Sequence, residues 1–509
     1  MAFLFNKNKK KILFVAPEAA PFIKAGGLGE VVFALPRALE QIGYDVRVMV
    51  PLYAGVDTDK FQLNMELQGL EVPTESTSDN QNEPSHLICN VKKYIPKDDN
   101  GHTTTVTYFL ENQEYYESRS NVYGYGDDVV RWNLLCRGTL EFLRLTDDWT
   151  PDVIVANDWQ TGFLPNYLKT TYKNDKKLSK IATVFIIHNL YYQSMFDHRY
   201  VSELDYDDGQ SLIPSFYDQR IYKINGMRRG IMYSDKISTV SPTYAREIMT
   251  EDYGELLNNL LQERRAHVSG VLNGLDYQSL NPETDVNLVA NYNYKNIEDR
   301  EKNKLELQAR FNLPQNKDTP LFCVVSRFVE QKGFDLFMDI LEPVIKELKI
   351  QLIILGSGDA KYMGFFKELV EKLPEQVSAH LNYDNTLPRL IFGGADIILI
   401  PSKFEPCGLS QIEAMRYGVI PIVRKTGGLA DSVTDFNPDT GKGTGFVFDN
   451  YDALSLVLTI ARAVENYKNK SLWKKIQKQA MQEDFSWTKS ALEYSKIISK
   501  AITYHKNNK

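Results

Sequence analysis

Short apolar runs alternate with helical patterns through the first half of the chain. Apolar runs at 11–16 and 45–50 flank residues 31–42, where apolar residues recur with a helical period. Further runs at 152–156 and 183–187 predict additional strands. A strand–helix–strand order implies parallel strands joined by crossover helices. The first half therefore predicts a doubly wound parallel sheet.

The second half repeats this pattern. Four runs predict buried parallel strands, at 321–325, 351–355, 397–400 and 420–423. The Asn273–Gly274 turn predicts the passage between two domains. Residues 293–307 are charged and predict a surface helix. The fold class expected is therefore α/β, with one doubly wound sheet in each of two domains.

Length and charge limit the choice of partners. A chain of 509 residues is too long for one hydrophobic core. Its net charge of −7 argues against nucleic acid and anionic membranes as partners. Any phosphate site must therefore be built from local groups.

The cysteines and apolar segments indicate a cytoplasmic protein. The four cysteines are far apart and form no C-x-x-C pair, which favours reduced thiols. No run of 18 apolar residues occurs, and the opening residues 1–5 are too short for a signal segment. A plastid location is the alternative, although no transit peptide is recognisable.

The first candidate site residue is Glu405, within the segment PSKFEPCGLSQIEAMRYG at 401–418. It follows the apolar run 397–400 and precedes a helical pattern that starts at Leu409. Ligands of open α/β sheets bind outside strand carboxyl ends, and helix amino termini favour anions. The alternative is that Glu405 only caps the helix.

A glycine-rich loop, KAGGLGE at 24–30, follows the first strand. Its glycines would let backbone N–H groups approach an anion, and Lys24 adds a positive charge. It is not a dinucleotide fingerprint, because Val32 stands where a third glycine would be needed. A simple turn is the alternative. The related segment KTGGLAD at 425–431 suggests one such loop in each domain.

Four other polar residues follow predicted strands: Asp158, His188, Arg327 and Lys332. Two fixed cations could hold a diphosphate and stabilise it as it leaves. The alternatives are a helix cap for Asp158, a core position for His188 and solvated charges for the cations. The D-x-D pairs at 57–59 and 205–207 are interpreted as solvated surface, so no metal site is expected.

Together these motifs resemble the bacterial glycogen synthases and plant starch synthases. The resemblance extends from residue 11 to about residue 487. The motifs that carry it, in chain order, are KAGGLGEVV (24–32), NDWQTG (157–162), IHNLYYQ (187–193), VSPTYAREI (240–248), VLNGLD (271–276), VSRFVEQKG (325–333), PSKFEPCGLSQ (401–411), RKTGGLADSV (424–433) and DFSW (484–487).

The resemblance implies two Rossmann-like domains facing across a cleft (the GT-B fold). They would comprise an acceptor-side domain over 1–272, a nucleotide-sugar domain over 273–484, and a C-terminal helix over 485–509 that packs back on the first domain. It implies retaining transfer of glucose from ADP-glucose to the nonreducing end of an α-1,4-glucan, without a cofactor or metal. The partners would be the nucleotide sugar and the glucan.

The resemblance also implies roles for individual residues. The catalytic group would be Glu405, His188, Asp158, Lys332 and Arg327. The donor-binding group would be Lys24, Gly26, Gly27, Arg327, Lys332, Glu413, Thr426, Gly427 and Gly428, with backbone amides of the glycine loops meeting the phosphates.

The sequence departs from the family pattern at several positions. Glu30 stands where the family often has Asp, which puts donor affinity or choice in question, and Lys403 replaces a usual arginine. Other functions considered are a UDP-glucose-preferring synthase, a glucan phosphorylase and a noncatalytic glucan-binding protein. Oligomeric state is left open.

Overall fold

The computed structural model describes residues 9–77, 82–97, 104–202 and 206–508. Residues 1–5, Asp205 and part of the polar segment 74–85 lie outside this description. The chain divides into two compact units. Unit 1 comprises residues 1–240, 245–274 and 487–509, and unit 2 comprises 241–244 and 275–486. The passages fall at Gly274/Leu275 and Ser486/Trp487, within two residues of the domain limits expected from the sequence.

Unit 1 contains a nine-stranded sheet in the order β3-β4-β5-β2-β1-β6-β7-β8-β9. Its strands are parallel except where β4 pairs antiparallel with β3 and β5. The strands are β1 (Lys11–Val15), β2 (Asp45–Pro51), β3 (Asn64–Pro73), β4 (His86–Tyr94), β5 (Val106–Glu111), β6 (Val153–Asn157), β7 (Ala182–Ile187), β8 (Lys236–Thr239) and β9 (Val268–Gly270).

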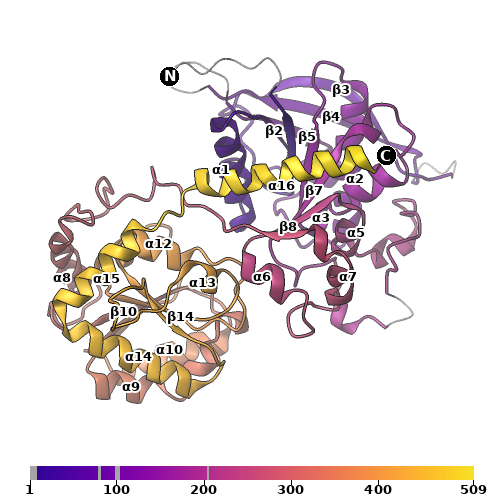
Figure 1. Ribbon diagram of the computed structural model, residues 1–509. Helices are drawn as coiled ribbons and strands as arrows, with labels where there is room; N and C mark the ends of the chain where they lie inside the picture. The colour runs from indigo at the N-terminus through magenta and orange to yellow at the C-terminus, as the bar shows by residue number, and fades with distance from the viewer. Residues whose placement is uncertain (1–8, 78–81, 98–103, 203–205, 509) are drawn as a thin grey trace. The chain divides into compact units, whose positions relative to one another are not determined.

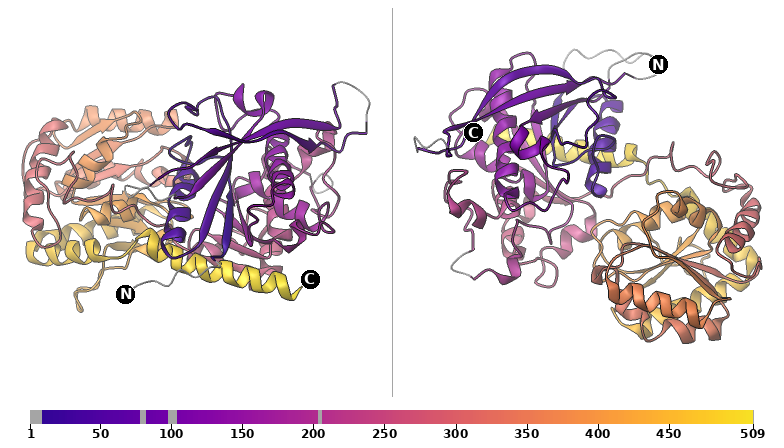
Figure 2. Two further views of the ribbon diagram at one scale, coloured as in Figure 1. Left: turned by 90° about the horizontal axis from the view of Figure 1, so that it is seen from above. Right: turned by 180° about the vertical axis from the view of Figure 1, so that it is seen from behind.

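Helices cover this sheet, and the last helix of the chain is one of them. Figures 1 and 2 show α16 running alongside the sheet, where it contacts α1, β7 and β8. Of the described helices, none is long and apolar enough to cross a membrane. The helices of this part are α1 (Gly27–Gln41), α2 (Asp128–Leu145), α3 (Asp158–Thr161), α4 (Phe163–Lys169), α5 (Gly226–Tyr233), α7 (Asn258–Glu263) and α16 (Trp487–Asn507). Helix α6 (Pro242–Glu247) begins within the unit 2 segment 241–244 and ends in unit 1.

Unit 2 contains a six-stranded, wholly parallel sheet in the order β12-β11-β10-β13-β14-β15. Its strands are β10 (Leu321–Val325), β11 (Gln351–Leu355), β12 (Val377–His380), β13 (Ile397–Ile400), β14 (Ile420–Arg424) and β15 (Phe446–Phe448). Its helices are α8 (Arg300–Arg310), α9 (Leu341–Leu348), α10 (Ala360–Lys372), α11 (Leu387–Gly394), α12 (Ser410–Arg416), α13 (Gly427–Ser432), α14 (Ala453–Lys468) and α15 (Lys470–Gln482).

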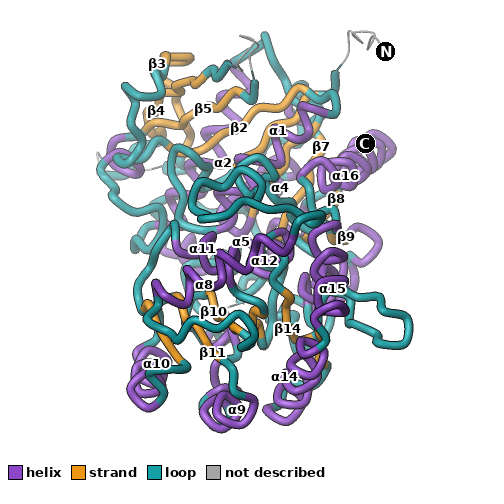
Figure 3. Tube along the Cα trace, turned by 90° about the vertical axis from the view of Figure 1, so that its left-hand side faces the viewer, coloured by secondary structure: helices purple, strands orange, loops and turns teal. Residues whose placement is uncertain are grey.

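Two hydrophobic clusters fill the two faces of this second sheet. Residues of α8, α11 and α12 pack on one face, and residues of α9, α10 and α14 pack on the other. Figure 3 shows these two helical layers on either side of the strands. Both units are therefore doubly wound, as the sequence predicts, and the antiparallel β3–β4–β5 edge is an addition to that prediction.

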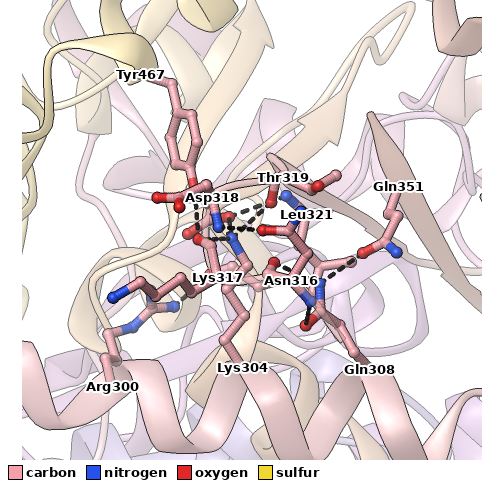
Figure 4. A network of polar contacts seen from close by, with 12 residues as sticks. Arg300, Lys304, Gln308, Asn316, Lys317, Asp318, Thr319, Leu321, Gln351 and Tyr467 are labelled. Carbon is pink, nitrogen blue, oxygen red and sulfur yellow. Dashed lines mark hydrogen bonds and ion pairs between the residues drawn. The ribbon is translucent and has the colours of Figure 1, made fainter. Parts of the chain in front are cut away.

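The expectation of a surface helix at 293–307 is only partly right. Helix α8 is shorter than expected, and Arg300 and Lys304 on it are 5% and 4% exposed. Lys304 Nζ donates to the carbonyl oxygens of Lys317 and Thr319 at 2.8 and 2.6 Å (Figure 4). It also lies 2.7 Å from Asp396 Oδ2. A buried charge needs such partners. The expectation of a surface helix assumed that every charged residue is exposed, which is wrong for Arg300 and Lys304.

Of the D-x-D pair at 205–207, Asp205 lies outside the described residues, and Asp207 is not solvated surface. Asp207 is 8% exposed and accepts two hydrogen bonds from the Arg229 guanidinium, at 2.9 and 2.8 Å. The Asp207 carboxylate is therefore held inside the protein by a buried arginine. All four cysteines are buried free thiols.

Candidate functional site

In each sheet there is one point where the order of successive strands reverses. In unit 1, β1 lies between β2 and β6, and in unit 2, β10 lies between β11 and β13. Crevices outside the strand carboxyl ends at such switch points are where open α/β sheets bind ligands. The sequence-predicted residues fall into two groups at these points. Lys24, Asp158 and His188 belong to unit 1, whereas Arg327 and Glu405 belong to unit 2.

The glycine-rich loop of unit 1 is held by a buried carboxylate. Glu18 follows β1 and is 1% exposed. Its Oε2 accepts hydrogen bonds from the backbone N–H groups of Ala25 and Gly26, the latter at 3.1 Å, and its Oε1 accepts from the Tyr123 hydroxyl at 3.2 Å. The Gly26 N–H expected to meet a phosphate is therefore used inside the protein, and α1 begins one residue later, at Gly27.

Lys24 is at the exposed side of this loop. Its Nζ lies 2.5 Å from Glu30 Oε1, and both side chains are about half exposed. Exposed ion pairs contribute little to stability, so Lys24 can exchange Glu30 for another anion.

Asp158 and His188 are adjacent at the carboxyl ends of β6 and β7. Asp158 Oδ1 accepts the His188 backbone N–H at 2.7 Å, and Asp158 has a left-handed backbone with φ of 55°. Such a backbone is uncommon outside glycine and concentrates at functional sites. Burial, with the nearby charge of Glu18, raises the pKa of Asp158 to about 7, although two backbone hydrogen bonds oppose the shift.

His188 is neutral in this environment. Burial lowers its pKa to about 3. Its Nε2 lies 3.0 Å from Asn157 Oδ1, and the Asn157 amide is oriented by donating Nδ2 to the carbonyl oxygens of Val15 and Val155, at 3.0 and 3.2 Å. Nε2 therefore carries the proton and donates a hydrogen bond to Asn157 Oδ1. Nδ1 is left without a proton and can accept a hydrogen bond from a hydroxyl group.

In unit 2, the loops after β10 and β13 are tied together. Glu405 is 6% exposed, and its Oε2 lies 2.5 Å from Lys332 Nζ and accepts the Ser402 hydroxyl at 3.0 Å. The Lys403 N–H donates to the Gln331 carbonyl oxygen at 2.9 Å. Lys332 and Glu405 thus form one charged pair at the switch point, because β10 and β13, which they follow, are adjacent in the sheet.

Gly333 makes this close approach possible. Its φ is +75°, and a Cβ at this position would overlap the Pro401 carbonyl oxygen. A residue with a side chain would force the two loops apart. The position of Lys332 beside Glu405 therefore depends on a glycine one residue later.

Arg327 lies in the same loop and is exposed. Within the described part of the chain its guanidinium has no ion-pair or hydrogen-bond partner, which leaves its donors available to an anion. Glu413 lies on α12, one turn of helix after the 401–408 loop, and is partly buried.

The second glycine loop is packed against the Glu405 loop. Its Gly428 N–H donates to the Glu405 carbonyl oxygen at 3.0 Å, and the Thr426 N–H donates to the Arg424 carbonyl oxygen at 3.0 Å. A Cβ on Gly427 would overlap the Glu405 carbonyl oxygen, and one on Gly428 would overlap that of Cys407. These glycines allow the close packing of the two loops, and the Gly428 amide, which was expected to meet a phosphate, donates within the protein.

Sequence reasoning missed two residues of the unit 1 site, Glu18 and Asn157. Each follows or ends a strand of the switch point, β1 and β6 respectively. The rule that polar groups at strand carboxyl ends form the site would have found both, had it been applied to every such position.

Comparison with known proteins supports the two-part organisation. Residues 11–263 match the family described as starch synthase catalytic domain, and residues 306–480 match glycosyl transferases group 1. The chain is 42% identical over 498 residues to a glycogen synthase of Clostridium acetobutylicum, covering 97% of this chain and 100% of that protein. It is 39% identical over 495 residues to a glycogen synthase of Thermotoga maritima, covering 97% and 99%.

Solved structures give the same result. The catalytic domain of starch synthase IV from Arabidopsis thaliana, bound to ADP and acarbose, superposes with a TM-score of 0.80 at 31% identity, covering 97% of this chain and 100% of that one. A sucrose-phosphate synthase from Thermosynechococcus elongatus, at 16% identity and a TM-score of 0.55 over 96% and 98% of the two chains, shares the fold. The chain therefore belongs to the glycogen and starch synthase family of glycosyltransferases.

Proposed function

We propose that this protein transfers glucose from ADP-glucose to the 4-hydroxyl at the nonreducing end of an α-1,4-glucan, with retention of configuration. The observation that carries the proposal is the pairing of Lys332 with Glu405 at the unit 2 switch point, beside the unpartnered Arg327. The Arabidopsis relative, which is described as bound to ADP and acarbose, supports an adenine nucleotide and a glucan analogue as ligands of the family.

The side chains suit cleavage of a glycosyl–phosphate bond. As this bond breaks, the diphosphate gains negative charge and the sugar develops oxocarbenium character. Arg327 and Lys332 would neutralise the departing diphosphate, which reduces the barrier without requiring a metal. The Glu405 carboxylate would face the positive charge on the sugar. Neutral His188 would accept a sugar hydroxyl through Nδ1, and Asp158 would do so as a carboxylate.

Retention would arise from attack on the same face that the leaving group occupies. In that scheme an oxygen of the departing phosphate takes the proton of the acceptor hydroxyl while the new glycosidic bond forms. Asp158 and Glu405 belong to different units, so the paired-carboxylate arrangement of retaining glycosidases, with carboxyl groups about 5 Å apart, is not the arrangement we propose.

The direct test is incorporation of labelled glucose into glycogen from ADP-glucose and from UDP-glucose, each with and without EDTA. We expect transfer from ADP-glucose that persists in EDTA, with slower transfer from UDP-glucose. Faster transfer from UDP-glucose would reverse the donor assignment. Glucan binding without transfer from either donor would indicate a noncatalytic protein, and phosphate-dependent release of glucose 1-phosphate would indicate a phosphorylase.

Substitution of the unit 2 charges tests the mechanism. We expect Glu405→Ala and Arg327→Ala each to lower kcat by at least about 10²-fold, because each removes a charge aimed at the transition state. Circular dichroism should show an unchanged fold. Lys403→Ala is the matched control, because Lys403 is exposed and pairs only with Glu330 on the surface among the described ion pairs. Near-normal kcat in either variant would remove that residue from its proposed role.

A further inference from the structure

A hollow of about 580 Å³ lies on unit 2, between helix α15 and the hairpin 437–443. Helix α15 is at the surface of this unit (Figures 1 and 3). None of the sequence-predicted site residues lines the hollow. The lining residues are Thr440, Gly441, Lys442, Ser471, Lys474, Lys475, Lys478, Gln479 and Gln482.

Helix α15 presents two different faces. The face toward the core is buried and contributes Trp473, Ile476 and Met481 to the packing. The residues of α15 that line the hollow recur at helical spacing on the other face, and all of them are polar or charged. The helix therefore holds its lysines on a rigid support.

The hairpin is fixed to α15 by one glutamine. Gln479 donates Nε2 to the Gly441 carbonyl oxygen at 2.9 Å and accepts the Gly443 N–H at 3.2 Å. Within the hairpin, the Asn437 N–H donates to the Lys442 carbonyl oxygen at 2.9 Å. Gly441 has φ of +63°, and a Cβ there would lie 2.5 Å from Lys475 Nζ. The Lys475 amino group thus lies against the hairpin, and both walls of the hollow are preformed.

The charge of the hollow is unbalanced. Its lining contains Lys442, Lys474, Lys475 and Lys478 and no carboxylate. Among the described residues, the ion pair formed by these four lysines is that of Lys474 with Glu298, at 3.1 Å. Lys474 and Lys478 are four positions apart on one helix, where like charges repel. Such a concentration is unexpected in a protein whose net charge is −7.

We propose that this hollow binds a small phosphorylated anion that carries two or more negative charges. Lysine ammonium groups form charge-assisted hydrogen bonds to phosphate oxygens, and the hydroxyl groups of Ser471 and Thr440 offer further polar contacts. The volume suits a small molecule. The site is separate from the residues assigned to glucosyl transfer and does not depend on that assignment.

Lysine footprinting of the full-length protein tests the site. Acetylation of each lysine is followed by mass spectrometry at increasing concentrations of inorganic pyrophosphate, against sodium chloride of equal ionic strength. We expect Lys474, Lys475 and Lys478 to react at least about threefold more slowly when pyrophosphate is bound, because an ammonium group held by phosphate is not nucleophilic. Lys346 and Lys496, which pair with neighbouring glutamates elsewhere, serve as internal controls.

Paired variants separate a specific site from general charge. We expect Lys475→Gln with Lys478→Gln to raise the pyrophosphate concentration that half-protects Lys474 by at least about tenfold, because two of the charge-assisted contacts are lost. The control Lys346→Gln with Lys496→Gln removes the same charge elsewhere and should leave the protection unchanged. Both variants replace exposed or partly exposed lysines, so folding should be preserved.

The outcomes decide between a site and an adventitious ion. Absence of protection, or equal protection by sulfate or by chloride, would overturn the proposal. Repeating the titration with glucose 6-phosphate and with ADP identifies the source of the phosphate, since the tighter ligand protects at the lower concentration. In the mass spectra, acetylation of Lys332 is measured separately from that of the four lysines of the hollow. Binding of ADP at the proposed donor site is therefore distinguished from binding in the hollow.

Discussion

Asp158 and His188 are neighbours whose pKa values move in opposite directions. Burial disfavours the charged form of each, which raises the pKa of the carboxyl to about 7 and lowers that of the imidazole to about 3. Near neutral pH the histidine is neutral and does not titrate, whereas the aspartate changes from protonated to ionised. A pH dependence of this site between pH 6 and 8 therefore belongs to Asp158.

This difference predicts the pH profile of glucosyl transfer. Because the proposed role of Asp158 requires its carboxylate, we expect kcat/KM to rise with pH through about 7. Asp158→Asn should lower the activity and abolish this rising limb, since an amide does not titrate in this range. Initial rates from pH 5.5 to 8.5 at subsaturating donor provide the measurement. A limb that persists in the variant would assign the titration to another group.

Glu18 is a positioning residue for the glycine-rich loop. Glu18→Ala would leave the N–H groups of Ala25 and Gly26 without the acceptor that fixes the backbone of this exposed loop. We expect the donor KM to rise about tenfold or more, with a smaller change in kcat. Glu18→Gln keeps an oxygen acceptor and should restore most of the affinity.

The same pair of variants has a second readout. The charge of Glu18 contributes to the raised pKa of Asp158, so Glu18→Gln should shift the rising limb of the pH profile to lower pH. A merely structural role for Glu18 would not produce this shift. Equal loss of kcat in both variants, with the KM and the pH profile unchanged, would contradict the positioning role.

At the level of elements, buried parallel strands are what the sequence predicts best. Strands β10 and β13 have the bounds expected, because a strand buried on both faces is a continuous apolar run. Helix α1 begins at Gly27, four residues before the expected start, because the glycines of the loop form its first turn. Strand β4 alternates in burial, but its sequence HLICNVKKY does not alternate regularly between apolar and polar residues, and β3 shows neither pattern, so both went unrecognised.

The candidate site was predictable to the level of strand ends, and less so in its hydrogen bonds. The pairing of Lys332 with Glu405 follows from the adjacency of β10 and β13. The internal use of the Gly26 and Gly428 amides does not follow from sequence, because a glycine that approaches a ligand and one that approaches another loop have the same local signature.

Helix α8 illustrates how a charged residue can fix a sheet. Lys304 joins α8 to Asp396, whose Oδ2 also accepts the Leu321 N–H at 2.9 Å, at the start of β10. The hydroxyl oxygen of Tyr467 on α14 accepts a hydrogen bond from the same Lys304 ammonium group at 2.8 Å. One lysine therefore links two helices to the amino ends of the strands whose carboxyl ends carry Lys332 and Glu405.

Lys304→Met tests this link. We expect the variant to lower the free energy of unfolding of unit 2 by about 3–5 kcal/mol, because it leaves Asp396 as a buried unpaired charge. Hydrogen exchange of β10 and β13 amides measures the effect. Lys302→Met, on the same helix but with a side chain 68% exposed, should change it by less than about 0.5 kcal/mol. Similar exchange rates in the two variants would show that the Lys304–Asp396 contact does not make this contribution to the free energy of unfolding.

At the scale of the whole molecule, the last segment of the chain belongs to unit 1, although all but four residues of unit 2 lie between it and the rest of unit 1 in the sequence. The chain leaves unit 1 after Gly274 and returns at Trp487. The two passages lie side by side, since the Leu275 N–H donates to the Phe485 carbonyl oxygen at 2.7 Å and the Ser490 hydroxyl donates to the Leu272 carbonyl oxygen at 2.7 Å. Unit 1 therefore depends on a helix, α16, that is made only after all of unit 2.

The contacts of α16 show what unit 1 gains from it. Its Ala501 is fully buried, and its His505 Nδ1 lies 3.0 Å from Asp235 Oδ2, next to β8. Burial opposes the ionisation of Asp235, but hydrogen bonding to His505 and the charge of Lys169 lower its pKa overall. This contribution to stability is present at neutral pH and is lost as the pH falls below the ordinary range for an aspartate.

Ala501→Asp separates the two units experimentally. A carboxylate placed on the buried face of α16 has no partner, so it should detach the helix or be held at a cost of several kcal/mol. We expect hydrogen exchange to accelerate by at least about tenfold in α1, β7 and β8, which α16 contacts, while β10, β11 and β14 keep their protection. Thr503→Asp, on the exposed face of the same helix, should change neither set. Equal acceleration in both units would mean that they unfold as one, and that α16 stabilises the whole molecule and not unit 1 alone.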